Sequence, residues 1–301
     1  MSKPVVINAV PAADDVCQPR QHRTLWQDAW IRLRRNKLAV VGGLFILIIA
    51  FGAIFAPLIT PYDFAKQDMT AILEPPSAQH WFGTDGLGRD VFARLLYGAR
   101  TSLAVGIFVQ VIVLFIGLPI GAFAGTMGGR VDNLLMRFVD IMYGFPDILL
   151  IILLRAVLGG SIYMIFLAIG LVAWVNVARL VRGQVLSLKE RDFVTAARAM
   201  GGTNSYITLR HLLPNTLGPV IVAVTFGVPR AIFTEAALAY IGIGVKPPTP
   251  SWGAMIRDGA DVIFAAPYLV AIPAIAIAVL MLAFTFLGDG LRDALDPRLR
   301  R

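Results

Sequence analysis

Four charged side chains interrupt stretches that are otherwise almost entirely apolar. Arg230 and Glu235 lie in one such stretch, Asp140 and Asp147 in another. A charge at the lipid-facing centre of a membrane helix costs about 2.5–3.5 kcal/mol, so all four must face protein or water. The spacing of seven predicts that the two aspartates share a helix face, whereas Pro229 leaves open whether Arg230 and Glu235 meet. These residues either tie the chain to a partner subunit or line a pathway for a zwitterionic solute.

A polar segment, residues 191–215, separates two of the apolar stretches. Its apolar residues recur at i, i+3, i+4 and i+7, which predicts a helix from Asp192 to residue 200 with one apolar face and Arg198 opposite. A helix lying on lipid usually exposes large apolar residues, whereas an alanine-rich face favours a protein groove. The face consists of Phe193, Ala196, Ala197 and Met200.

Glycines and a proline are expected to end the helices of this segment. Gly201, followed by Gly202, stands where a helix is capped by a residue in the left-handed conformation. A second short helix is predicted over residues 205–212, ending before Pro214. The segment therefore reads as two short helices and a turn.

Several kinds of chemistry are not expected of this sequence. His22, His80 and His211 lie far apart, which predicts no metal site. None of the five lysines follows a glycine, so a phosphate-binding loop is not expected. The single cysteine, Cys17, allows neither an internal disulfide nor a thiolate metal cluster. We therefore expect no catalytic residue and no cofactor bound by this chain, and we do not expect an enzyme.

The composition is that of an all-α integral membrane protein. Of the 301 residues, 57% are hydrophobic and 15% charged, with a mean hydropathy of +0.72, whereas soluble domains carry roughly 25% charged residues. None of the apolar runs alternates as a barrel strand would, so helices are expected. Six spans are predicted, at residues 38–59, 101–129, 138–158, 159–178, 216–245 and 262–288.

The positive charges predict an orientation. Nineteen of the 27 Lys and Arg residues fall in segments on one side of the predicted spans, which places both termini in the cytoplasm. This topology explains the net charge of +8 without nucleic-acid binding, and the basic N-terminal segment is expected to contact anionic lipid. The first apolar run, from Leu38, is too long for a cleavable signal peptide.

These predictions divide the chain into three parts: a cytoplasmic basic segment, a domain of six spans, and a cytoplasmic tail. Residues 83–100 are expected to form an interfacial helix whose apolar side faces the membrane, rather than to contact a substrate. The three parts are residues 1–37, 38–288 and 289–301; the six-span domain includes extracytoplasmic loops at 60–100 and 246–261 and a cytoplasmic loop at 179–215.

The cytoplasmic loop resembles that of a known family, the permease subunits of bacterial ABC importers, in its pattern "EAA, three residues, G, nine residues, I, one residue, LP". Thr195 stands in place of the Glu of this pattern and His211 in place of the Ile; Asp192 or Glu190 could make the contact of that Glu. The residues that match are Ala196, Ala197, Gly201, Leu213 and Pro214.

Three further segments, residues 80–100, 244–259 and 288–300, resemble the dipeptide/oligopeptide/nickel branch of these permeases, in particular its second, "C"-type subunit. The resemblance implies a type I ABC importer transmembrane fold with a cytoplasmic coupling helix. The residues that it assigns to ATPase coupling are Asp192, Phe193, Ala196, Ala197, Met200, Gly201, Leu213 and Pro214.

The resemblance also implies partners: a homologous second permease forming a heterodimer, two ABC ATPases that bind ATP and Mg, and an extracytoplasmic solute-binding protein, in the bacterial inner membrane. The stiff outer segment 246–253, "KPPTPSWG", is either a rigid turn or part of the mouth that receives cargo. Peptides are the expected cargo, with nickel chelates, glutathione, opines and sugars as alternatives. A self-sufficient secondary transporter would show symmetry between its halves, and none is detected in the sequence.

Overall fold

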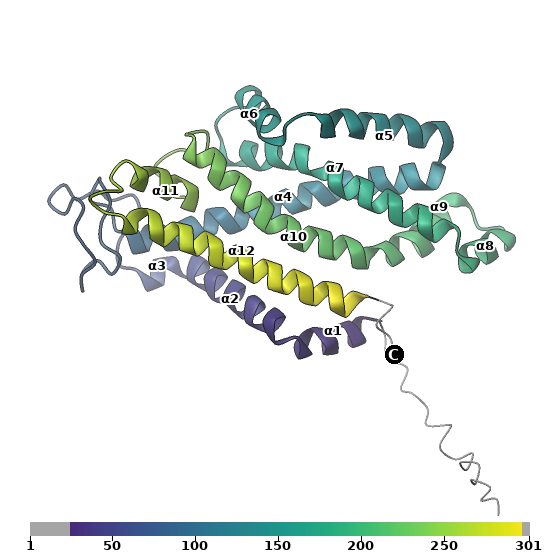
Figure 1. Cartoon of the computed structure of the whole chain (residues 1–301), viewed down its shortest axis with the longest axis horizontal. Helices are drawn as coiled ribbons and strands as arrows, with labels where there is room; N and C mark the ends of the chain where they lie inside the picture. The colour runs from purple at the N-terminus through teal and green to yellow at the C-terminus, as the bar shows by residue number, and fades with distance from the viewer. Residues whose placement is uncertain (1–24, 297–301) are drawn as a thin grey trace, which may run out of the picture.

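The computed structural model describes residues 25–296, and these residues form an elongated bundle of helices (Figure 1). Cys17 and most of the basic N-terminal segment lie outside the described residues. The helices are α1 (Leu25–Arg35), α2 (Lys37–Ile54), α3 (Ala56–Ile59), α4 (Val91–Met127), α5 (Gly129–Gly144), α6 (Asp147–Leu158), α7 (Ile162–Lys189), α8 (Asp192–Ala199), α9 (Asn204–Ile207), the π-helical turn η2 (Thr208–Leu212), α10 (Leu213–Tyr240), α11 (Trp252–Ala260) and α12 (Tyr268–Leu295).

Five of these helical segments are long and apolar enough to cross a bilayer: α2, α4, α7, the continuous run from α9 to α10, and α12. They correspond to five of the six predicted spans. The sixth, predicted over residues 138–158, is divided between α5 and α6, which meet at an angle of 93°. Phe145 is extended there, because the following Pro146 disfavours a helical conformation of the residue before it.

This break corrects one prediction. Asp140 lies on α5 and Asp147 begins α6, so the two aspartates do not share a helix face. Each has a different arginine as its partner.

The segment 60–100, predicted as a loop, includes the beginning of a helix. Asp90 caps α4, its carboxylate accepting a hydrogen bond from the Ala93 amide at 2.7 Å, so residues 91–100 are the first turns of a 37-residue helix. The expected interfacial helix is therefore not separate, and Val91, expected to face lipid, is buried. At 1.5 Å per residue α4 is about 55 Å long, well beyond the roughly 30 Å of a bilayer's hydrocarbon core.

The second short helix of the polar segment does not end before Pro214. This proline lies in the first turn of α10, directly after the π-helical turn η2 and within the continuous run from α9 to α10. α7 continues to Lys189 and α12 to Leu295, so the predicted loop 179–215 and tail 289–301 both begin inside helices.

Close approach of α4 to α7 holds the centre of the bundle together. Gly117, Gly121 and Gly125 recur every fourth residue along α4, and a Cβ added to Gly121 would lie 2.4 Å from the Ala178 carbonyl oxygen on α7. Small residues at this spacing let two membrane helices pack backbone to backbone. Any side chain larger than hydrogen would separate the two helices.

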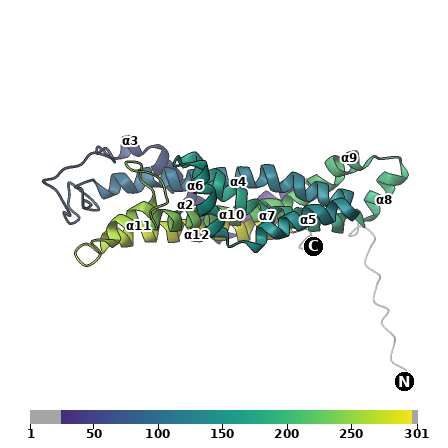
Figure 2. The ribbon, with the colours of Figure 1, turned by 90° about the horizontal axis from the view of Figure 1, so that it is seen from above.

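The two ends of the bundle carry different elements. α8 and α9 project at one end, whereas α11 and the loop 60–90 lie at the other (Figures 1 and 2). α1 packs against α12, and the end of α12 points toward the same end of the bundle as α8 (Figure 1).

Candidate functional site

A cavity of about 670 Å³ lies between α4, α6, α7 and α10, beside the break that separates α5 from α6. Most of its wall is apolar, and the break exposes the first turn of α6 to it. Its polar lining consists of Gln110, Asp147, Asn176, Arg230 and Thr234. The cavity has the size of a small-molecule binding site.

One pair of opposite charges lies in this cavity. Arg230 of α10 donates a hydrogen bond to the Asp147 carboxylate at 2.8 Å, and both side chains are exposed. An exposed ion pair of this kind stabilises a protein by only about 0–1 kcal/mol. The pair is thus open to exchange with the charges of a bound solute.

Glu235 does not belong to this pair. It is fully buried in the C-terminal part of α10, and neither carboxylate oxygen has a hydrogen-bond partner among the described residues. Arg230 and Glu235 therefore face different neighbours.

Asp140 lies outside the cavity and pairs with Arg179 of α7, whose guanidinium also lies 4.2 Å from the centre of the Tyr143 ring. Nearby, Arg182 binds Asp132 through two hydrogen bonds of 2.5 and 2.7 Å. From the sequence, both arginines were counted only among the charges of the predicted cytoplasmic loop. The two arginines lie three residues apart on α7, opposite two aspartates on α5, and this spacing could have predicted the two ion pairs from the sequence.

The structure divides the apolar face predicted for α8. Ala197 is only 4% exposed and, with Val194, packs inside this chain, whereas Phe193, Ala196 and Met200 are exposed. The helix forms where it was predicted, but Ala197 does not share an exposed face with the other three residues: it packs in an apolar cluster of this chain that includes Ile207 and Leu212. The free face consists of Phe193, Ala196 and Met200.

Gly201 has the predicted left-handed conformation, with φ +85°, and ends α8. The amide of Gly202 donates to the Ala197 carbonyl at 2.9 Å, which completes the cap. Asp192 and Pro214 are exposed and Leu213 is half-buried. His211 lies against the rings of Phe193 and Tyr206, at 6.4 and 5.6 Å between ring centres, so it packs as an apolar residue would at this position.

The loop that carries α8 is anchored to the C-terminal end of α4. Lys189 donates hydrogen bonds to the carbonyl oxygens of Gly125 and Thr126, at 3.1 and 2.8 Å. The Thr126 hydroxyl hydrogen-bonds that of Thr208 at 2.9 Å. Both helices that flank the loop are thus tied to the end of α4.

A charged network joins the N-terminal end of α4 to α11. Asp258 accepts hydrogen bonds from Arg89 and Arg94 at 3.3 Å each and from Arg257 at 2.9 Å. Asp85 binds Arg89 at 2.7 Å. These contacts fix the start of α4 against α11, and they give residues 85–94 a structural role.

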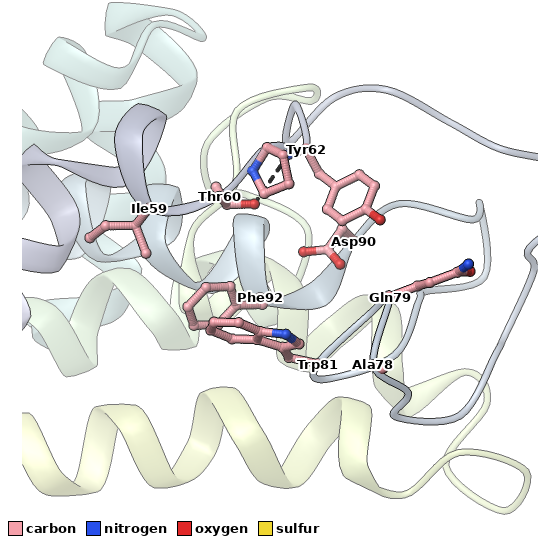
Figure 3. Close-up of a pocket in the computed structure, with 9 residues that line it drawn as sticks. Ile59, Thr60, Tyr62, Ala78, Gln79, Trp81, Asp90 and Phe92 are labelled. Carbon is pink, nitrogen blue, oxygen red and sulfur yellow. Dashed lines mark hydrogen bonds between the residues drawn. The ribbon is translucent and has the colours of Figure 1, made fainter.

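A second, smaller cavity of about 220 Å³ opens near the N-terminal end of α4 (Figure 3). Trp81 and Phe92 form one side, with ring centres 5.0 Å apart. Asp90 and Gln79 contribute polar groups, and Tyr62 lies across from the aromatic pair (Figure 3).

Long apolar helices around a central cavity with opposite charges, and a short amphipathic helix projecting at one end, define a membrane permease. Residues 117–301 match the family described as binding-protein-dependent transport system inner membrane component, and residues 24–76 match the N-terminal TM domain of oligopeptide transport permease C. This chain belongs to that family of ABC importer permeases.

Similar proteins cover almost the whole chain. The oligopeptide transport system permease protein OppC of Bacillus subtilis is 43% identical over 97% of this chain and 96% of its own length. The dipeptide permease DppC of the same organism is 46% identical over 96% of this chain and 90% of its own. The glutathione permease GsiD of Escherichia coli O157:H7 is 42% identical over 98% of this chain and 96% of its own length.

Among solved structures, the inward-facing MetNI methionine ABC transporter matches with a TM-score of 0.56 at 20% identity, over 67% of this chain and 96% of that one. The likeness supports the predicted type I importer fold.

Proposed function

We propose that this chain forms half of the translocation pathway for di- or oligopeptides in an ATP-driven importer. The central cavity carries this proposal, because its apolar wall and its one pair of opposite charges suit a peptide zwitterion. Relatives named for oligopeptide, dipeptide and glutathione transport support the same cargo class. Glutathione, itself a peptide, is the second candidate.

The Arg230–Asp147 pair suits reversible binding. A peptide's carboxylate can replace Asp147 at Arg230 while its ammonium group replaces Arg230 at Asp147. One ion pair is thereby exchanged for two, and no charge is left unpaired in the cavity.

Coupling to ATP is assigned to α8. Its exposed Phe193, Ala196 and Met200 lie at the projecting end of the bundle (Figure 2), where an amphipathic helix can enter a groove on a cytoplasmic ATPase. Two such ATPases would bind ATP and Mg²⁺. Asp192, beside this face, is available for a polar contact with the ATPase.

The remaining partners follow from the other surfaces. Exposed apolar side chains on α5 and α6, such as Phe138, Leu149 and Leu153, are assigned to a homologous second permease, and those of α2 to lipid. We place the α8 end and both termini in the cytoplasm of a bacterium, and the loop 60–90 with the outer cavity toward the solute-binding protein. The charge distribution along the sequence supports this orientation.

The test is transport by the complete importer in proteoliposomes. With its partner subunits and a binding protein loaded with alanyl-alanine, the complex should accumulate the dipeptide when ATP is present. Ala196→Arg should abolish peptide-stimulated ATP hydrolysis by blocking the groove, whereas Arg198→Ala, on the opposite side of α8, should leave it near normal. Uptake without ATP, or full coupling in Ala196→Arg, would refute the proposal.

A further inference from the structure

A single carboxamide, that of Gln110, lies in the middle of α4. Between Leu103 and Ala124 it is the only side chain with a hydrogen-bonding group. It is 6% exposed, so it faces the interior of the bundle, and it lines the central cavity. The sequence analysis read this stretch only as an uncharged span.

The Gln110 carboxamide has no partner. No described residue forms a hydrogen bond with it, although a carboxamide offers two donors and an acceptor. Burying such a group unpaired costs about 1–3 kcal/mol. The sealed Ser102 hydroxyl on the same helix has no access to solvent, whereas the Gln110 carboxamide reaches the cavity and whatever fills it.

Gly227 holds the carboxamide in this position. A Cβ added at Gly227 on α10 would lie 2.3 Å from Oε1 of Gln110 and 2.7 Å from its Cδ. The carboxamide therefore lies directly against the backbone of α10, in space that only glycine leaves free. An alanine there would displace it.

We propose that Gln110 binds the backbone amide of the transported peptide and that Gly227 is its positioning residue; this inference rests on the proposed function. The side-chain carbonyl accepts a hydrogen bond from a peptide N–H and the NH₂ group donates to a peptide C=O. Arg230 and Asp147 in the same cavity bind the charged termini. Each of these contacts uses groups that all peptides share.

With this arrangement the cavity recognises the backbone of a peptide whatever side chains the peptide carries. The apolar wall, formed by residues such as Val113, Ile151 and Phe226, contacts varied side chains without directional demands. A site built to hydrogen-bond a group discriminates against ligands that lack it, because its own polar atoms are then left unpaired. The cavity therefore selects for the peptide bond itself.

The experiment compares alanyl-alanine with its ester isostere, in which oxygen replaces the amide N–H. The reconstituted importer is supplied with binding protein saturated with either compound, so that selection by the binding protein is removed. The wild type should transport the dipeptide about tenfold faster, which corresponds to about 1.4 kcal/mol. Gln110→Leu and the equally long Gln110→Met should bring this ratio close to one.

Two further variants separate binding from structure. Gly227→Ala should lower the dipeptide-to-ester rate ratio in the same way. Adding Gly227→Ala to Gln110→Ala should not lower this ratio further, because the carboxamide that the new methyl group would displace is already absent. Gln184→Leu, the same change on α7 outside the cavity, should keep the wild-type ratio.

A wild type that transports both compounds equally, or a Gln110→Leu importer that keeps the tenfold ratio, would overturn the inference. Failure of both Gln110→Leu and Gln110→Met to assemble would assign the carboxamide a structural role and also overturn it. Failure of the proposed function looks different, since the wild type would then accumulate neither compound.

Discussion

Replacing Gly121 by alanine should force α4 away from α7. The new methyl group would lie 2.4 Å from the Ala178 carbonyl oxygen and 2.8 Å from Cβ of Val181. Ordinary contacts of a Cβ begin at 3.4 Å, so the helices must separate by about 1 Å, a gap that weakens dispersion contacts along the interface. Overpacking of this kind costs about 1–3 kcal/mol.

The matched control is Gly183→Ala on α7, where an added Cβ would meet nothing within 4 Å. There the change should stabilise the helix by about 0.5–1 kcal/mol, since alanine loses less backbone entropy than glycine. The two variants should thus differ by about 1.5–4 kcal/mol, or roughly 2–6 °C in the midpoint of thermal unfolding for a chain of this length.

The assay is thermal unfolding of both purified variants in the same detergent, followed by the loss of monodisperse protein. Gly121→Ala should unfold below the wild type and Gly183→Ala at or above it. Equal midpoints would mean that α4 and α7 do not approach as closely as described, and the account of the central packing would be wrong.

Two other predictions concern the charges and the topology. Arg230→Leu should impair transport far more than Arg257→Leu, because Asp147 then has no partner while Asp258 retains Arg89 and Arg94; equal uptake rates by the two variants would remove any role for the Arg230 pair. Cysteines placed at Lys66 and Thr249 in a Cys17→Ser background should react with an impermeant thiol reagent in intact cells and one at Thr203 should not, and labelling at Thr203 would reverse the orientation.

The helical bundle could be predicted from the sequence, because a long apolar run identifies a membrane span without knowledge of the tertiary structure. The break at Pro146 was missed because apolar composition on both sides outweighed one proline. Proline at position 214 was misread for the opposite reason, since the same residue that ends a helix also suits its first turn.

The residues of the candidate site were harder to predict from the sequence, because the periodicity of a helix does not show what packs against each of its faces. Ala196 and Ala197 are the same residue type, yet Ala197 packs within this chain and Ala196 is exposed. Likewise, the four charges inside apolar stretches were found at once, but their partners depend on how α5, α7 and α10 are arranged. Gln110 was missed because an uncharged carboxamide barely lowers the hydropathy of its span.

α4 is held at both ends: Asp258 and its arginines join the N-terminal end to α11, and Lys189 and Thr208 join the C-terminal end to the segments on either side of α8. A helix about 55 Å long that rotates by about 10° about a point near its midpoint moves its two ends by about 5 Å in opposite directions. Gln110 lies near that pivot, where displacement is smallest. Under the proposed coupling through α8, a pull on this helix would swing the two ends of α4 in opposite senses while Gln110, the proposed peptide ligand, stays almost still.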